Sequence, residues 1–388
     1  MKKMIALLAL LAAFPPLSTD MYLAAIPLLV SRWQQPLAVV NLTLVGFFIT
    51  YCGFLLVYGP LSDRYGRRPP LLVGLVLYTI SSLLCAWAGK VEVLIVSRLL
   101  QGAGAAAASS IAFAICKDRF EGRLRQRIFI QLGIIVAAAP MVAPLVGGWI
   151  IERFDYQWVF ILQAGLGIVA FIGVFIMQES LQALDREGLK QVFLGYLRLL
   201  KNPRYTALMI SFACIGVPFF AFIAISSDIY ITGLGYSEQE YGYFFGANAS
   251  AFMIAPIVFS KMVKRFRLAN LLTVSFLGVL LSSIPMMSDL IPFPWRLALP
   301  MWLLTFFFSF GRPPGNNLIL EQVDRDVGSA SSLMVFSFFI TGSCSMWFIS
   351  LGWSDPVGIL GSLGCGSAVL TFCGWFLANH FLGLKFPD

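Results

Sequence analysis

Long apolar runs separated by short polar turns fill the chain from end to end. Most runs reach about 18 residues or more, which is enough for a helix to cross a hydrocarbon core of roughly 30 Å. The predicted spans are residues 4–30, 38–60, 71–89, 92–115, 128–151, 157–177, 205–227, 239–260, 269–287, 296–319, 329–350 and 356–381. The pattern therefore predicts an all-α polytopic membrane protein with twelve transmembrane helices.

Composition supports the same class. Of the 388 residues, 59% are hydrophobic and only 12% are charged, whereas a soluble domain carries about 25% charged residues. A mean hydropathy of +0.84 leaves no room for a large soluble domain, and a transmembrane barrel would show short alternating segments instead. Lys2 and Lys3 precede the first apolar run as in a signal peptide, but the run continues past Asp20 to Val30. We therefore interpret it as a span.

The longest polar stretch, residues 178–204, divides the chain near its midpoint. We predict an N-terminal six-helix bundle over residues 1–177, a cytoplasmic linker over 178–204 and a C-terminal six-helix bundle over 205–388. Part of the linker has the pattern of an amphipathic helix on the membrane surface, with the apolar members Val192, Phe193, Tyr196, Leu197, Leu199 and Leu200. Pro60 and Pro256 precede basic loops in the two halves, a faint repeat of the kind found in transporters.

Basic residues indicate the orientation in the membrane. Of the 27 Lys and Arg residues, only Arg32, Lys90, Arg153 and Arg296 fall in turns on the side opposite the N-terminus, and Arg98 and Arg312 fall inside spans. Because Lys and Arg collect in cytoplasmic loops, both termini are predicted to be cytoplasmic. The same rule explains the net charge of +8, so we expect no nucleic-acid partner.

Cysteine and histidine give no sign of catalysis or metal binding. The seven cysteines lie in or at the ends of apolar runs without a CxxC pair, and the single histidine, His380, ends the last run. We therefore expect no metal and no cofactor. A membrane enzyme would need a His, Cys or paired-carboxylate constellation that the sequence does not offer.

Asp20 is the one carboxylate that lies well inside an apolar run. An ionised carboxylate in hydrocarbon costs roughly 2.5–3.5 kcal/mol on insertion scales, so a retained one is a candidate functional group. Asp20 lies about 24 Å along the first span from Met4, and Arg98 lies about 9 Å from the outer end of the fourth span. The similar depths predict opposite-charge partners in the outer half of the membrane, although Arg98 could instead snorkel to the outer interface.

Three motifs resemble those of the major facilitator superfamily. The loop between spans two and three resembles the family's G-x-L-x-D-R-x-G-R-R/K loop, and this resemblance implies a conformational latch formed by Gly59, Asp63, Arg64, Gly66, Arg67 and Arg68. Gly59 would allow close helix approach. Span four carries the R-x-x-Q-G pattern as Arg98, Gln101 and Gly102. Span five is similar to the exporter motif G-x-x-x-G-P-x-x-G-G at Pro140, Pro144, Gly147 and Gly148, with Ala139 and Ala143 in place of the first two glycines. The simpler alternatives are a plain basic loop and an ordinary proline kink.

The first span resembles that of the Bcr/CflA drug-resistance subfamily. The resemblance rests on the run from Phe14 to Leu23, which contains Thr19-Asp20-Met21-Tyr22-Leu23, and Ala24 stands where the subfamily has proline. This superfamily lines its cavity with spans one, four, seven and ten. The resemblance therefore implies a substrate cavity with the residues Asp20, Arg98, Phe219, Phe220, Arg312 and Asn316. Arg312 could equally belong to the cytoplasmic charge belt.

Together these features predict a multidrug drug:proton antiporter of the bacterial inner membrane. It would export small, mostly apolar drugs by alternating access, with Asp20 and Arg98 in proton coupling. Its partners would be protons, a small-molecule substrate and the lipid bilayer, and we expect a monomer. A dedicated exporter of one metabolite or siderophore is the main alternative, and a channel is another.

Overall fold

The computed structural model describes residues 2–181 and 189–384, and every regular element in these ranges is helical. The chain divides into two compact units, which are described separately. Residues 182–188 of the predicted linker lie outside the described ranges.

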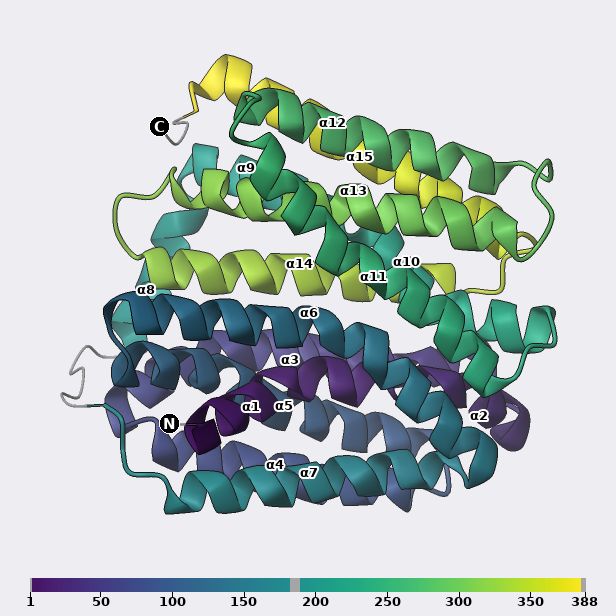
Figure 1. Cartoon of the computed structure of the whole chain (residues 1–388), viewed down its shortest axis with the longest axis horizontal. Coiled ribbons are helices and arrows are strands. Elements are labelled where there is room, and N and C mark those ends of the chain that lie inside the picture. The colour runs from purple at the N-terminus through teal and green to yellow at the C-terminus, as the bar shows by residue number, and fades with distance from the viewer. Residues whose placement is uncertain (1, 182–188, 385–388) are drawn as a thin grey trace. The chain divides into compact units, whose positions relative to one another are not determined.

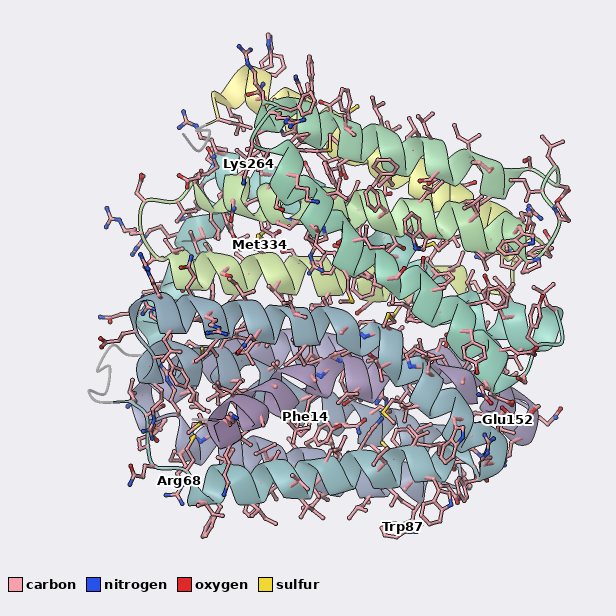
Figure 2. The ribbon with its side chains drawn as sticks, viewed as in Figure 1. Phe14, Arg68, Trp87, Glu152, Lys264 and Met334 are labelled. Atoms are coloured by element: carbon pink, nitrogen blue, oxygen red, sulfur yellow. The ribbon has the colours of Figure 1, made fainter. Side chains whose placement is uncertain are left out.

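Unit 1 comprises Met1–Leu189 together with Gly235–Gly246. Its helices are α1 (Lys2–Asp20), η1 (Leu23–Ala25), α2 (Ile26–Trp33), α3 (Leu37–Tyr65), α4 (Arg68–Ala86), α5 (Val91–Arg119), α6 (Gly122–Arg153) and α7 (Tyr156–Ile176). α5 packs against α1, α3 and α4, while α4 also packs along α7 (Figure 1). Arg68 lies at one end of these helices, and Trp87 and Glu152 lie at the other (Figure 2).

Unit 2 comprises Lys190–Leu234 and Ala247–Asp388. Its helices are α8 (Leu189–Leu200), α9 (Pro203–Cys214), α10 (Val217–Ser227), η2 (Asp228–Gly233), α11 (Glu238–Met262, whose first turns belong to unit 1), α12 (Leu268–Ser283), η3 (Ile284–Met287), α13 (Trp295–Leu320), α14 (Val327–Ile349) and α15 (Pro356–Leu382). α12 packs against both α13 and α15, and α9 packs against α14 and α15 (Figure 1).

The twelve predicted spans correspond to these helices. Eleven helical segments of the described ranges are long and apolar enough to cross a membrane. The twelfth span is α13, which has 26 residues and whose hydropathy is lowered by polar side chains such as Arg312, Asn316 and Asn317. The all-α fold with twelve spans is thereby confirmed.

Two spans that we predicted as continuous helices are interrupted. Span one, predicted over 4–30, breaks at Met21 and Tyr22 between α1 and η1, and span seven, predicted over 205–227, breaks at Ile215 and Gly216 between α9 and α10. The hydropathy pattern could not reveal either break, because the residues at both are as apolar as their surroundings. Pro16 and Pro27 on either side of the first break, and Pro218 after the second, are local causes because proline supplies no backbone N–H.

Small residues bring α4 and α5 into close contact. A Cβ on Gly104 of α5 would lie 2.6 Å from the Tyr78 backbone nitrogen and 2.7 Å from the Gly74 carbonyl oxygen. A Cβ on Gly74 of α4 would lie 2.2 Å from Ala107 Cβ. Close approach between small residues supplies the packing energy of helices in a membrane.

Replacing Gly104 by leucine should therefore destabilise unit 1. Overpacking of this kind costs about 1–3 kcal/mol, and here the obstruction is rigid backbone. We expect Gly104→Leu to lower the thermal unfolding midpoint of the detergent-purified protein. Gly53→Leu is the matched control, because a Cβ on Gly53 meets no described atom within 4 Å. Equal midpoints for the two variants would contradict the close α4–α5 contact.

Candidate functional site

The break in span one frees a backbone carbonyl in the middle of an apolar segment. The Tyr22 N–H donates to the Thr19 carbonyl oxygen at 3.1 Å, which is a three-residue step in place of the α-helical bond to Ser18. Ala25 N donates in the same way to Tyr22 O at 2.9 Å. The Ser18 carbonyl therefore lacks its usual helical donor and needs another.

Arg98 supplies that donor. Its side chain is fully buried, and Nη1 donates to Ser18 O at 3.0 Å and to Gln101 Oε1. The guanidinium also lies over three aromatic rings, 4.4 Å from the centroid of Phe47, 5.1 Å from Tyr22 and 5.9 Å from Phe160. The partial negative charge at the C-terminal end of α1 and the ring faces both favour a cation here.

Asp20 lies at the same break but does not pair with Arg98. Its side chain is 5% exposed and accepts a 2.8 Å hydrogen bond from Thr19 Oγ1. Within the described residues, no ion pair of 4.0 Å or less joins Asp20 to Arg98. The structure thus places the two predicted residues at one break, with a backbone carbonyl instead of the carboxylate as the partner of Arg98. Full burial of Arg98 is also incompatible with snorkelling to the interface.

Gln163 of α7 is a member of this network that the sequence did not single out. Its Nε2 donates to Leu17 O at 3.2 Å and to Ser18 O at 3.5 Å, while its Oε1 accepts from Gln101 Nε2 at 2.8 Å. Gln101 Nε2 also donates to Ser82 Oγ at 2.8 Å. The available signal was an amide within an otherwise apolar span, but span six was not among those expected to line the cavity.

The span-five motif packs against the break. α6 continues as a helix through Pro140 and Pro144. A Cβ on Gly147 would lie 2.0 Å from Met21 O, and a Cβ on Gly148 would lie 2.2 Å from Glu238 O. Glycine at these positions therefore allows other backbone segments to approach α6 closely. In the span-four motif, a Cβ on Gly102 would similarly lie 2.3 Å from Phe47 O.

The predicted latch centres on Arg67. Gly66 forms the turn with a φ of +89°, a value that favours glycine. The Arg67 side chain is almost fully buried; Nε donates to Asp118 Oδ2 at 2.7 Å, and Nη1 donates to Ser62 Oγ and to Asp63 Oδ1. Burial acts to lower the pKa of Arg67, but Asp118 and Asp63 outweigh burial, so its pKa is raised.

The other latch residues have different surroundings. Arg64 lies over the exposed Tyr65 ring at 5.4 Å, and Arg68 Nη2 donates to the Phe175 carbonyl oxygen. Gly59, which we expected to permit close helix approach, does not do so within the described residues, because a Cβ there would meet no atom within 4 Å. This position lies inside α3 with open space beside it, so the sterics expected of the motif do not apply to it.

Glu179, in the predicted linker, anchors the latch loop. Its carboxylate accepts backbone hydrogen bonds from Arg67 N at 3.0 Å, Arg68 N at 2.9 Å, Ser180 N at 2.8 Å and Leu181 N at 3.1 Å. Arg67 and Arg68 begin α4, so the carboxylate caps the positive end of that helix. Partial burial acts to raise the pKa of Glu179, but the four N–H donors outweigh it and hold the pKa below its usual range. The sequence pattern did not identify this residue as part of the latch.

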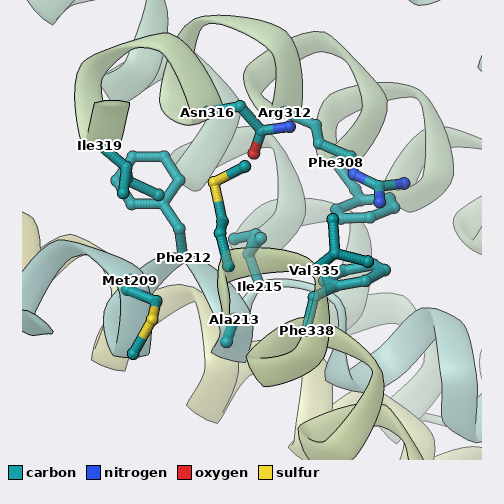
Figure 3. Close-up of a pocket in the computed structure, with 11 residues that line it drawn as sticks. Met209, Phe212, Ala213, Ile215, Phe308, Arg312, Asn316, Ile319, Val335 and Phe338 are labelled. Atoms are coloured by element: carbon teal, nitrogen blue, oxygen red, sulfur yellow. The ribbon is translucent and has the colours of Figure 1, made fainter. Parts of the chain in front are cut away.

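Unit 2 contains a small cavity beside two predicted cavity residues. The cavity has a volume of about 30 Å³, and Arg312 and Asn316 line it together with Met209, Phe308 and Phe338 (Figure 3). The Arg312 guanidinium lies 4.2 Å from the Phe338 ring centroid and 5.8 Å from that of Phe308.

The predicted residues Phe219 and Phe220 do not line this cavity but pack against its aromatic wall. Phe219 stacks on Phe308 with centroids 5.8 Å apart, and Phe220 contacts Phe338 at 5.0 Å. Asp20 and Arg98 belong to the other unit. The structure thus distributes the six predicted cavity residues over two separate clusters.

Loss of the Glu179 charge should destabilise the latch in a pH-dependent way. At pH 7, Glu179→Gln should lower stability by about 1 kcal/mol, because hydrogen bonds to a charged acceptor are lost while solvent screens part of the effect. Because the pKa of Glu179 is lower in the folded protein than in the unfolded chain, its carboxylate stabilises the fold at pH values above the ordinary pKa. This stabilisation is lost as the pH falls through the lowered pKa. The thermal midpoints of wild type and variant should therefore converge in acid.

The exposed Glu152, at the opposite end of unit 1, provides the matched control (Figure 2). Glu152→Gln should leave the midpoint nearly unchanged at either pH. A gap between wild type and Glu179→Gln that persists undiminished in acid would contradict the capping role.

Comparisons with known proteins agree with this architecture. The family model described as "Major Facilitator Superfamily" matches residues 8–346. The multidrug transporter MdfA of Escherichia coli O157:H7 is 27% identical, with 71% of this chain and 68% of that protein covered. The bicyclomycin resistance protein homolog of Haemophilus influenzae is 25% identical, with 97% and 96% covered. An uncharacterised MFS-type transporter of Bacillus subtilis, YdgK, is 27% identical, with 87% and 86% covered.

Solved structures show the same fold at low identity. The nucleoside transporter NupG has a TM-score of 0.79 and 12% identity, with 97% of this chain and 98% of that chain covered. A bacterial homologue of the human lysosomal transporter Spinster has a TM-score of 0.76 and 14% identity, with 99% and 98% covered. The chain is a multi-pass membrane protein that belongs to the major facilitator superfamily of transporters, with relatives of the Bcr/CflA drug-resistance type.

Proposed function

We propose that this transporter exports small, mostly apolar drugs in exchange for protons, with Asp20 as the group that carries the proton. The observation that supports this most strongly is a buried carboxylate at a helix break, with no cationic partner among the residues that the structure describes. Such a group can gain or lose a proton without first breaking an ion pair. The relatives named multidrug transporter and bicyclomycin resistance protein homolog support drugs as the cargo.

Arg98 would stabilise the broken end of α1 without preventing Asp20 from binding and releasing a proton. Its guanidinium binds the Ser18 carbonyl, two residues before Asp20, and it forms no ion pair with that carboxylate within the described residues. Substrate entering the site would displace the proton or disturb the Arg98 contacts. If the proton affinity of Asp20 differs between the inward-open and outward-open states, alternating access couples proton movement to substrate movement.

The cargo would contact an aromatic wall in unit 2. Phe219, Phe220, Phe308 and Phe338 form a connected set of ring contacts, and Arg312 covers two of the rings. Large ring faces suit apolar and aromatic compounds of varied shape. Arg312 and Asn316 would add hydrogen-bond donors at the edge of this wall.

The remaining assignments are part of the same proposal. The loop around Arg67 would act as the conformational latch, and the span-five glycines would support export. We also propose the bundle boundaries given above, cytoplasmic termini in a bacterial inner membrane, and action as a monomer. α8 would lie at the cytoplasmic surface, because it has a buried side with Tyr196 and Leu199 and an exposed apolar side with Leu194, Leu197 and Leu200.

Replacing Asp20 by asparagine should abolish transport driven by a pH gradient. The change keeps the size of the side chain and removes its proton chemistry, so the protein should still fold and insert. Dye efflux in inverted membrane vesicles, with the pH gradient imposed and then collapsed, measures the effect. We expect at least a tenfold loss of gradient-dependent efflux.

Glu92→Gln is the matched control, since Glu92 is an exposed acid at the start of α5 and should be dispensable. Undiminished gradient-driven efflux by Asp20→Asn would exclude Asp20 as the coupling group. A panel in which wild type exports a single metabolite or siderophore and no drug would favour the dedicated exporter instead.

A further inference from the structure

The cavity in unit 2 combines one charged side chain with an apolar wall. Arg312 and Asn316 line it from the same face of α13, because they stand four residues apart on that helix (Figure 3). Its other described lining residues are apolar or aromatic, among them Met209, Phe308 and Phe338. We infer that this cavity binds an anionic oxygen group, so that the cargo is an aromatic compound with a carboxylate. This inference rests on the proposed drug export and names the chemical class of the cargo.

The helices around the cavity carry no acidic residue. Its lining residues come from α9 and the residue that follows it, from α13 and from α14. These three helices contain no Asp or Glu, whereas Arg312 lies in the cavity wall. Glu321 is the first acid after Arg312, roughly 13 Å further along the helix axis. The wall is therefore positive, and its apolar surroundings screen that charge poorly.

Arg312 can bind an anion while it packs on the aromatic wall. Its Cζ lies 4.2 Å from the Phe338 ring centroid and 5.8 Å from that of Phe308. A cation over a ring face is stabilised through its charge and does not use its N–H donors for that contact. A guanidinium has five such donors, so it can bind the two oxygens of a carboxylate in addition to its contacts within the protein. The Asn316 amide can donate to the same group.

The cavity has the size of one such group and not of a whole drug. Each water-sized group needs roughly 10–15 Å³ of such space, and the cavity has about 30 Å³. The two oxygens of a carboxylate would therefore fill it. The aromatic part of the cargo would lie beside the cavity, against Phe219 and Phe220, which contact its ring wall.

The same features disfavour a cationic cargo. A cationic compound would bring a second positive charge to Arg312 in surroundings that screen it poorly, and α9, α13 and α14 have no carboxylate to offset it. A neutral aromatic compound would keep the ring contacts but lose the charge-assisted hydrogen bonds. The affinity should therefore be highest for an aromatic anion, lower for its neutral analogue and lowest for the corresponding cation.

Three naphthalene compounds of similar size separate these classes. At neutral pH, naphthoate is an anion, naphthamide is neutral and naphthylmethylamine is a cation. Isothermal titration calorimetry on the detergent-purified full-length protein measures their binding. We expect naphthoate to bind about tenfold more tightly than naphthamide, which is the gain from one hydrogen bond to a charged group, and the amine to bind least. Equal affinities for naphthoate and naphthamide, or tightest binding of the amine, would overturn the inference.

Substitutions assign the preference to Arg312. Arg312→Gln keeps a polar side chain and removes the charge, so the affinity for naphthoate should fall about tenfold while that for naphthamide changes little. Arg265→Gln is the matched control, because it removes the same charge from an exposed position of unit 2 and should leave both affinities unchanged. A preference for naphthoate that survives undiminished in Arg312→Gln would overturn the role of this residue.

A second substitution keeps the test decisive if Arg312→Gln does not fold. Asn316→Asp keeps the size of the side chain and places a carboxylate on the same face of α13, one turn from Arg312. The affinity for naphthoate should then fall about tenfold, because the added charge repels the anion and competes for the guanidinium, and the affinity for naphthylmethylamine should rise. Unchanged affinities for both compounds in this variant would also overturn the inference.

The two proposals can fail separately, because Arg312 belongs to unit 2 and Asp20 belongs to unit 1. If naphthoate binds as expected but Asp20→Asn still exports dye against a pH gradient, the cavity recognises aromatic anions and Asp20 is not the coupling group. If Asp20→Asn abolishes coupled export and naphthoate binds no better than naphthamide, the coupling proposal stands and the charge preference of the cavity falls.

Discussion

A helix that breaks within a membrane must find hydrogen-bond partners for the backbone groups it releases. In hydrocarbon there is no water to provide them, and each unsatisfied group costs several kcal/mol. In span one, Tyr22 bonds Thr19 instead of Ser18, and the released Ser18 carbonyl accepts from Arg98 and Gln163. The cation and the break therefore depend on each other, since each would be costly alone.

The surrounding helices accommodate both the Arg98 guanidinium and the break in span one. Phe47, Tyr22 and Phe160 offer ring faces to the guanidinium, and Gln101 accepts from it. On another side, Gly147 lets α6 approach the Met21 carbonyl oxygen more closely than any other residue would allow. The outcome is an acid, Asp20, that is buried at the break and forms no ion pair with the described residues. That arrangement is the basis of the proposed proton binding.

Sequence reasoning located the spans because hydropathy and length determine them almost alone. The bounds of α5, predicted as 92–115 and observed as Val91–Arg119, illustrate how well turns and apolar runs fix a membrane helix. The break in span one was not predicted, because Met21 and Tyr22 are apolar or aromatic like their neighbours. The partner of Arg98 was not predicted either. The depth of a residue along its helix does not specify which face of span one contacts span four.

Residues that act through tertiary contacts were the hardest to recognise. Gln163 and Glu179 stand more than 60 residues from several of their partners, such as Gln101 and Arg67, and no local motif marks them. Conversely, Gly59 fits a family motif, but no atom of the described residues would lie within 4 Å of a Cβ there, so these surroundings give no steric reason for glycine. The motif residues that could be predicted were those whose chemistry is unusual for their surroundings, namely a carboxylate and a guanidinium in apolar spans.

The central claim is that Asp20 holds a proton that the cargo displaces. The most direct measurement is infrared difference spectroscopy on purified protein, recorded before and after addition of an exported dye at fixed pH. The account predicts that dye binding removes a protonated-carboxyl band, and that this change is missing in Asp20→Asn although the variant still binds dye. A band that changes equally in Asp20→Asn, or a wild-type protein that binds dye with no carboxyl change, would contradict it.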